Sequence, residues 1–222
     1  MARDTPWAKS SSGRAVSLLL PQPGDIDLGD ICRGLSRINR FSGATTGDAP
    51  WTVADHSVFV AAILRAAGCC DRTVLHGALH DAHEYATGDI TSPMQRAIAA
   101  IYASRHPAAA PVDAIKDIQD RVQAAILIHL GIERPTSADD AAVRAADVAA
   151  LLVERDQLMA PPPKDWGYQP EGDARTMFLL ASKRFSVFAV RGIDKHLERI
   201  VLGLAASARS PAPTLAPGGW CR

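Results

Sequence analysis

The sequence has no net charge, no membrane-length hydrophobic run and no paired pattern of cysteines. Its 24 lysine and arginine residues balance its 24 aspartate and glutamate residues, which excludes a broad electrostatic footprint for a nucleic acid polymer or an acidic membrane surface. The N-terminal apolar run, Val16 to Leu20, stops at Pro21 and is far shorter than the roughly 18 to 20 residues that span a bilayer. It therefore predicts neither a membrane span nor a signal peptide.

The 4 cysteines also lack the spacings that are typical of zinc knuckles or disulfide frameworks. Their simplest interpretation is as small apolar residues in a reducing compartment, so we expect a cytoplasmic protein. With 222 residues, 47% of them hydrophobic, the chain is long enough for one globular domain whose core needs no disulfide or metal.

What the sequence does have is helical periodicity along most of its length. No alternation of apolar and polar residues is long enough to support a sheet, so we expect the all-α class, with a single-domain helical bundle. Residues 1–26 are expected to form an extended arm, and residues 27–207 the helical domain. The segment 208–222, rich in Pro, Ala and Gly, is expected to be a disordered tail.

Capping signals set the expected helix ends. Asp27 is a candidate N-cap for a helix that runs into Arg40, and Thr52 with Asp55 resembles a capping box. Gly131 is a candidate helix C-terminal glycine. The helices expected after the first are 52–68, 73–85, 94–104, 111–130, 139–159, 173–185 and 189–207.

Two polar residues lie where helical spacing calls for apolar ones. His56 shares a helix face with Val53 and Phe59, and Asp147 lies between Val143 and Leu151. A carboxylate on such a face costs several kcal/mol unless it is paired, protonated or bound to a cation. Taken singly, the two residues are best explained as a hydrogen-bonded core histidine and an aspartate that caps a neighbouring helix.

A third segment, His80-Asp81-Ala82-His83-Glu84, favours a shared metal site. On a continuous helix His80 and Glu84 share one face, and Asp81 is about 100° around the axis from His80. Gly77, one turn earlier, is expected to leave room above that point. The mixed nitrogen and oxygen donors suit a catalytic divalent ion with open positions rather than a closed structural zinc site. The candidate ligands are His56, His80, Asp81 and Asp147.

Two other metal motifs fit less well. The start of a His-Glu-x-x-His protease motif at His83 fails, because Thr87 occupies the position of the second histidine. His76 and His80 form an i,i+4 pair that could bind zinc, but no acidic general base stands at the matching position.

In chain order, these residues resemble a known family. The matching elements are Arg40-Phe41, His56-Ser57, His80-Asp81-x-x-Glu84, Gly88-Asp89, Pro93 and Ala146-Asp147. This set resembles the HD-domain metal-dependent phosphohydrolases, and more narrowly the bacterial 5′-deoxynucleotidases and phage dATP triphosphohydrolases of that superfamily. The resemblance covers residues 27 to 160 and implies an all-α fold.

The resemblance also implies roles for individual residues. It implies that Glu84 orients or deprotonates the attacking water and that Arg40 holds the substrate phosphate. Asp89 is expected near the sugar or the water network, or as a cap of the turn after the helix. One divalent ion, cobalt, manganese or zinc, is implied at His56, His80, Asp81 and Asp147.

Phosphate ester chemistry agrees with these roles. A phosphate ester repels hydroxide, so hydrolysis needs positive charge on the phosphoryl oxygens and a pre-formed nucleophile, both of which a divalent ion supplies. A carboxylate such as Glu84 can serve as a general base toward that water. The guanidinium of Arg40 offers a planar fork that matches two phosphate oxygens.

Three aromatic or imidazole side chains, Phe41, Trp51 and His83, are candidates for contact with the substrate. Phe41, where the family usually has tryptophan, could keep a stacking or sugar-excluding role. Trp51 either reaches over the nucleoside or packs on the domain, and His83 either contacts a β-phosphate or stays exposed. Trp166, like Tyr168, lies outside the matched region and is expected to cover the bundle edge or a subunit contact.

The leading expectation is hydrolysis of a deoxynucleoside monophosphate to deoxynucleoside and phosphate. The alternatives are a triphosphohydrolase that releases triphosphate from a dNTP, and a non-catalytic nucleotide-binding module. Arg37, Arg96 and Lys116 are candidates to face a longer phosphate chain. The expected partner is a small deoxynucleotide, with no nucleic acid polymer and no membrane, and the resemblance implies a homo-oligomer, either a dimer or a larger ring.

Overall fold

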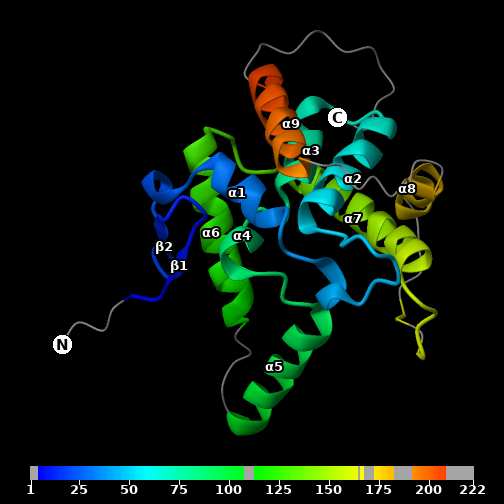
Figure 1. Ribbon diagram of the computed structural model, residues 1–222, viewed down its shortest axis with the longest axis horizontal. Helices are drawn as coiled ribbons and strands as arrows, with labels where there is room; N and C mark the ends of the chain where they lie inside the picture. Colours follow the sequence, from blue (N-terminus) through cyan, green and yellow to red (C-terminus); the bar gives the residue numbers. More distant parts are fainter. Residues whose placement is uncertain (1–4, 108–112, 165, 168–172, 183–191, 209–222) are drawn as a thin grey trace.

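The computed structural model describes residues 5–107, 113–164, 166–167, 173–182 and 192–208, and in this part the all-α prediction is confirmed (Figure 1). Pro111, Tyr168 and the tail from residue 209 lie outside the described residues. The α helices are α1 (Leu28–Leu35), α2 (Val53–Ala66), α3 (Asp71–Leu79), α4 (Glu84–Thr87), α5 (Ser92–Arg105), α6 (Ala114–Leu130), α7 (Ser137–Leu158), α8 (Asp173–Ser182) and α9 (Ile193–Ala208).

The expected N-terminal arm folds back on itself as a small antiparallel hairpin. Strand β1 (Trp7–Lys9) pairs with β2 (Ala15–Ser17), with Ala8 opposite Val16. Val16 is buried in the core, and Asp30 of α1 holds the turn by accepting hydrogen bonds from Ser11 Oγ at 2.6 Å and Ser12 N at 2.8 Å. The arm is therefore anchored to the helical body.

Local capping chemistry places most helix ends where the sequence predicts them. The Asp27 side chain accepts from the backbone N–H of Asp30, and Thr52 and Asp55 make both hydrogen bonds of a capping box. Gly131 ends α6 in the left-handed region, at φ 65°. Each of these residues relieves unpaired backbone groups at a helix terminus.

The first helix ends five residues before Arg40, which corrects the expected boundary. After Leu35 the chain turns, and Asn39 forms an isolated antiparallel bridge with Thr52. Arg40 then opens a short 3₁₀ segment, η2 (Arg40–Gly43). The cap of α2 thus holds the chain that carries Arg40 next to the helix that carries His56.

The single helix expected from Thr73 to Tyr85 is divided into α3 and α4, and this is the main correction at the motif. Residues 80–83 form a tight turn, in which Ala82 N donates to Leu79 O at 3.0 Å and Glu84 N to Asp81 O at 3.0 Å. These bonds span three residues instead of four, so this part of the chain is wound more tightly than an α-helix. The positions of His80, Asp81 and Glu84 follow from this turn.

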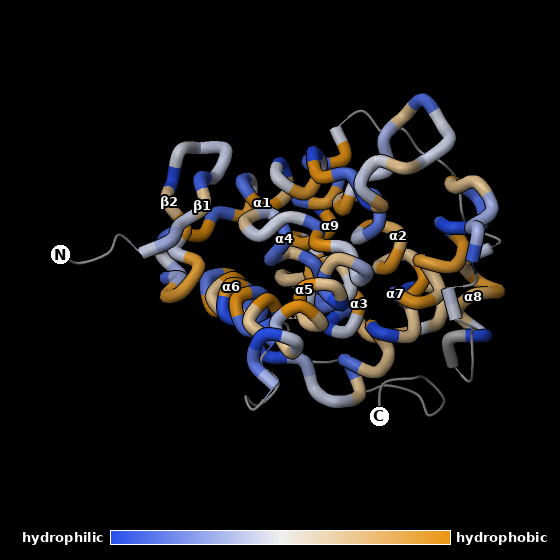
Figure 2. The backbone as a smooth tube through the Cα atoms, turned by 90° about the horizontal axis from the view of Figure 1, so that it is seen from below, coloured by the Kyte–Doolittle hydropathy of each residue, from blue (hydrophilic) through white to orange (hydrophobic). Residues whose placement is uncertain are grey.

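The core lies where α2, α3 and α7 pack together, with α9 across α1 and α3 and with α8 against α7. Figure 2 shows hydrophobic stretches along α2, α7 and α9. Large side chains with less than 2% exposure fill this core, among them Ile31, Leu35, Ile63, Leu64, Leu75, Leu79, Leu152 and Leu197.

Helix α5 projects from this body (Figure 1), and none of its residues is buried. Among the described helices, none combines the length and the apolar character that a bilayer crossing requires.

Candidate metal centre

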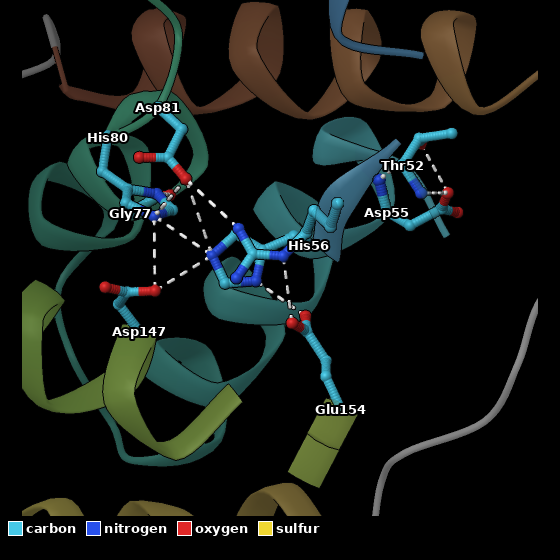
Figure 3. A network of polar contacts seen from close by, with 9 residues as sticks. Thr52, Asp55, His56, Gly77, His80, Asp81, Asp147 and Glu154 are labelled. Carbon is cyan, nitrogen blue, oxygen red and sulfur yellow. Dashed lines mark hydrogen bonds and ion pairs between the residues drawn. The ribbon is translucent and has the colours of Figure 1, made fainter. Parts of the chain in front are cut away.

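Three predicted ligands meet at one point from three parts of the chain (Figure 3). His56 lies on α2, His80 follows α3, and Asp147 lies on α7. Their ligand atoms are all within 4.8 Å of one another, with Nε2 of His56 at 3.3 Å from Nε2 of His80 and at 3.1 Å from Asp147 Oδ1. These three side chains could hold a metal ion.

Asp81, the fourth predicted ligand, faces the same point. Its Oδ2 lies 3.1 Å from His80 Nε2 and 3.7 Å from His56 Nε2. The tight turn after α3 lets two consecutive residues, His80 and Asp81, approach one point together. Two imidazole nitrogens and two carboxylate oxygens therefore surround a small volume.

The hydrogen bond that Nδ1 makes in each imidazole determines whether Nε2, which faces the cluster, can present a lone pair. His56 Nδ1 lies 2.7 Å from Glu154 Oε1, and His80 Nδ1 lies 2.8 Å from the carbonyl oxygen of Gly77. Both partners are acceptors, so Nδ1 donates in each ring, and a neutral ring presents the lone pair of Nε2. Lone pairs and carboxylate oxygens repel each other unless a cation or a proton lies between them, so this donor set fits a divalent ion.

The charges around the cluster shift the pKa values of its members. Burial opposes protonation of His80, but the charge of Asp81 and the hydrogen bond to Asp147 outweigh it and raise the pKa of His80 well above its usual value. Burial and Arg40 likewise oppose protonation of His56, and Glu154 and Asp147 raise its pKa. The surroundings of both rings thus favour positive charge.

Glu154 is a functional candidate that the sequence analysis missed. Its side chain has 0% exposure, and while Oε1 pairs with His56, Oε2 accepts from Arg40 Nε at 3.1 Å. Burial opposes its charge, yet His56 and Arg40 lower its pKa. It lies two helical turns after Asp147, on the same face of α7, and this spacing is the signal that could have identified it.

Arg40 is held by both its backbone and its side chain. Its N–H donates to the carbonyl of Trp51 at 2.9 Å, and its Nη1 lies 3.7 Å from Asp81 Oδ2. Together with the bond to Glu154, these contacts fix the guanidinium beside the donor cluster.

Glu84 lies near the cluster without the hydrogen bonds that a buried carboxylate usually has. The residue is 8% exposed, and its Oε2 has no hydrogen-bond partner in the part of the chain that the structure describes. Burial, then the charges of Asp81 and Asp89, raise the pKa of Glu84 to about 9, while Arg40 and His80 act in the opposite direction. Its protonation therefore depends on the positive charge nearby.

A cavity of about 720 Å³ opens beside these groups. Arg40, Asp81, Glu84, Asp89 and Asp147 line it on the polar side. Its volume is within the range of small-molecule sites. The other lining residues include Phe41, Arg96, Leu151, Met159, Lys164 and Trp166.

Two predicted substrate contacts lie elsewhere. Trp51 is 5% exposed and packs edge-on against Phe59 at 6.5 Å between ring centroids, so of its two considered roles the structure provides packing. His83 is half-buried, its backbone N–H donates to Gln123 Oε1 at 3.2 Å, and it does not line this cavity. Neither side chain is placed to contact a ligand in the cavity.

Other expectations change with the geometry. Trp166, expected at a bundle edge or a subunit contact, also lines the cavity. Of the basic candidates, Arg96 also lines it, whereas Arg37 borders a separate hollow and Lys116 pairs with Asp120 at 2.7 Å on α6.

Gly77 does not serve to leave room above the donors. A Cβ atom at this position would lie 2.2 Å from Leu64 Cδ1, so the glycine allows α3 to approach α2 closely. Its carbonyl then reaches His80 Nδ1.

No model of a known protein family matches this chain. Among curated proteins, an uncharacterized protein of Rhodobacter capsulatus is 34% identical to it over 155 residues, which are 68% of this chain and 72% of the relative. The aligned length therefore spans most of both proteins.

Proposed function

We propose that this chain, which belongs to the same protein family as the uncharacterized Rhodobacter capsulatus protein, is a metal-dependent phosphohydrolase of the HD-domain type. Its substrate is a deoxynucleotide, and the leading reaction is hydrolysis of a deoxynucleoside monophosphate to deoxynucleoside and phosphate. The observation that carries the proposal is the convergence of two imidazoles and two carboxylates on one point, with both carboxylates, Arg40 and Glu84 lining one cavity.

The divalent ion, cobalt, manganese or zinc, would be held by His56, His80 and Asp147, with Asp81 as the fourth ligand. When bound, such an ion supplies positive charge to phosphoryl oxygens and lowers the pKa of water. Glu154 and the Gly77 carbonyl fix the orientation of the two imidazoles from outside the cluster.

Arg40 binds the phosphate. Glu154 holds its Nε and Asp81 Oδ2 lies 3.7 Å from its Nη1, so the N–H groups of the terminal nitrogens that these two carboxylates do not use remain for anionic oxygens in the cavity. A planar fork of this kind matches two phosphate oxygens, and its orientation is set before the substrate arrives.

Glu84 is the general base. As a carboxylate it takes a proton from the water whose oxygen attacks the phosphorus. The bond between phosphorus and the 5′ oxygen breaks, that oxygen takes up a proton to give the deoxynucleoside, and Glu84 releases the proton that it accepted, so that one water is consumed in total. Glu84 lines the cavity together with Asp81 and Asp147, on which such a water would depend for its position.

The direct test is to incubate the full chain and a manganese or cobalt salt with each dNMP and dNTP. Chromatography then separates orthophosphate, tripolyphosphate and nucleoside. We expect orthophosphate and deoxynucleoside from at least one dNMP, and no metal-dependent product from any of these substrates would contradict the proposal.

Cleavage of a dNTP to deoxynucleoside and triphosphate is the second candidate, and a specific observation favours it. Arg96 and Lys164 line the same cavity and could neutralise additional phosphates. Tripolyphosphate as the main product in the same assay would select this reaction over the first.

A non-catalytic nucleotide-binding module is distinguished by the variant Glu84→Ala. We expect this variant to bind metal as the wild type does and to lose about 10²–10⁴-fold in turnover, the typical contribution of a general base. Retained turnover would exclude Glu84 from the mechanism. Nucleotide binding by the wild type without turnover of any nucleotide would favour the module.

A further inference from the structure

Part of the cavity lining is apolar and aromatic, unlike the carboxylates and Arg40. Phe41 and Trp166 contact each other there, with ring centroids 6.3 Å apart and planes tilted by 43°. Leu151 and Met159 line the same cavity, so apolar groups accompany the two rings. We call Phe41 and Trp166 the aromatic wall.

Two cationic side chains border these rings. The Arg40 guanidinium carbon lies 5.4 Å from the centroid of the Phe41 ring, and that of Arg155 lies 5.9 Å from the centroid of the Trp166 ring. Both distances are within the range of cation–π contacts, which hold a planar group in place. The indole, half-buried, is thus supported by Arg155 and still lines the cavity.

The backbone of the aromatic wall is strained at Phe41 and at the residue that follows it. Phe41 and Ser42 are the two non-glycine residues in the described chain with positive φ, at 56° and 54°. Such a conformation is unfavourable for residues that have a Cβ atom and persists only where the surroundings enforce it. With this backbone conformation the Phe41 ring lines the cavity, and the preceding residue, Arg40, contacts Glu154 and Asp81.

We propose that Trp166, together with Phe41, forms a binding subsite for a flat heteroaromatic ring, and that Trp166 determines affinity for the base of the nucleotide. This inference rests on the proposed function. A ligand that spans the cavity needs an anionic group for Arg40 at one end and a planar group for the aromatic wall at the other, and a nucleotide has both. Trp166 lies after α7, beyond the segment that carries the donors and Glu84.

The test compares a substrate that has a base with one that lacks it. Steady-state rates are measured for a dNMP and for 2-deoxyribose 5-phosphate in the wild type, Trp166→Leu and Trp166→Phe. Loss of stacking on one base corresponds to about a 10-fold change in affinity. We expect Trp166→Leu to raise KM for the dNMP by that factor with kcat retained, Trp166→Phe to restore most of the loss, and KM for the base-free ester to stay constant.

A binding measurement separates this inference from the proposed function. Deoxynucleosides, which carry no phosphate, are titrated against tryptophan fluorescence, with Trp7→Leu as the matched control because Trp7 is exposed on β1. We expect quenching in the wild type and in Trp7→Leu, and no saturable quenching in Trp166→Leu.

The outcomes are distinct. Quenching that depends on Trp166 in a protein that hydrolyses no phosphate ester would support the subsite and contradict the phosphohydrolase. Hydrolysis of a dNMP with an unchanged KM in Trp166→Leu, or an equal rise in KM for the base-free ester, would overturn the subsite and leave the phosphohydrolase standing.

Discussion

The donor cluster and the aromatic wall bound one cavity but are held in different ways. In the donor cluster, the His56 side chain is fully buried and its orientation is fixed by Glu154, which is itself fully buried. In the aromatic wall, Phe41 and Trp166 are half-buried, lie outside the α helices and contact each other through tilted rings. Two of the four donors, His56 and Asp147, thus lie on core helices, whereas both residues of the aromatic wall lie in segments between the α helices.

The functions proposed for the two regions, metal binding and binding of a base, account for this difference. Metal ligands need fixed distances, which packed helices supply, whereas a wall that accepts a base needs a surface and tolerates more variation in position. Variants of the donor cluster should therefore alter metal binding and turnover together, and variants of the aromatic wall should alter substrate affinity alone.

The largest effect is expected at Glu154, because its carboxylate holds both His56 and Arg40. Glu154→Gln keeps an acceptor for His56 but places an amide against Arg40. We expect metal affinity to fall about 10–100-fold, as for other residues that orient a metal ligand, and KM for the phosphate ester to rise. Metal titration with steady-state kinetics measures both.

Asp140→Asn is the matched control, because Asp140 is an exposed acid on the same helix. Quenching by deoxynucleosides should be normal in both variants. Unchanged metal affinity in folded Glu154→Gln would show that His56 needs no such support, and would remove the difference between the two regions.

The next largest effect is expected at Gly77, where α3 approaches α2 closely, and it concerns the free energy of unfolding. Gly77→Ala places a methyl group against Leu64, and we expect the free energy of unfolding to fall by about 2 kcal/mol, as for other overpacked sites. Urea unfolding measures the change, and Leu64→Val should recover part of it by removing the obstructing atom.

Gly203→Ala serves as the control for Gly77→Ala. Gly203 lies within α9, and a methyl group added there would meet no neighbouring side chain, so alanine should leave stability unchanged or increase it. Equal destabilisation by the two substitutions would show that the contact with Leu64 is not the cause.

A smaller effect concerns Glu84 in metal-free protein. Its pKa is raised from 4.5 to about 9, so between these values the native state retains a proton that the unfolded chain releases. Stability is therefore present below pH 4.5 and is lost as pH rises through the window. Glu84→Gln should be more stable than wild type by about 1–2 kcal/mol at pH 8 and equal to it near pH 4.5.

Thermal unfolding of metal-free samples across pH tests this expectation. A wild type and a Glu84→Gln variant with parallel pH profiles would mean that the carboxyl is not held in an unfavourable state.

The smallest effect is expected far from both regions, at Asp30. Burial opposes its charge, but hydrogen bonds from Ser11 and Ser12 outweigh burial and lower its pKa to about 2. Its contribution to stability is thus present above pH 4 and lost as pH falls toward 2. Asp30→Asn should cost about 1 kcal/mol at pH 7, measured by urea unfolding, with the difference shrinking in acid.

Metal affinity and nucleoside quenching should be normal in Asp30→Asn. A change in either would mean that the N-terminal hairpin is coupled to the cavity.

The donor cluster could be predicted from the sequence, the aromatic wall could not, and the only signal for Glu154 is its spacing of two helical turns from Asp147. His56 and Asp147 are conspicuous because they interrupt apolar helix faces, whereas Glu154 follows several other charged residues on α7. Trp166 comes after a run of prolines, where no periodicity predicts where a side chain lies.

The turn between α3 and α4 is also beyond sequence reasoning. His80 and His83 keep helical backbone angles, and this turn differs from a continuous helix in that its hydrogen bonds join residues three apart instead of four. Capping boxes, by contrast, are local chemistry, and the residue types at Thr52 and Asp55 are enough to predict one there.

The most direct test of the metal centre is a cobalt titration of the metal-free full chain, followed by equilibrium dialysis and visible absorption. We expect one cobalt ion per wild-type chain and per Asp140→Asn chain, with binding greatly weakened in His56→Ala, His80→Ala and Asp147→Ala. Cobalt binding that is absent in the wild type, or equal in all of these proteins, would contradict this expectation.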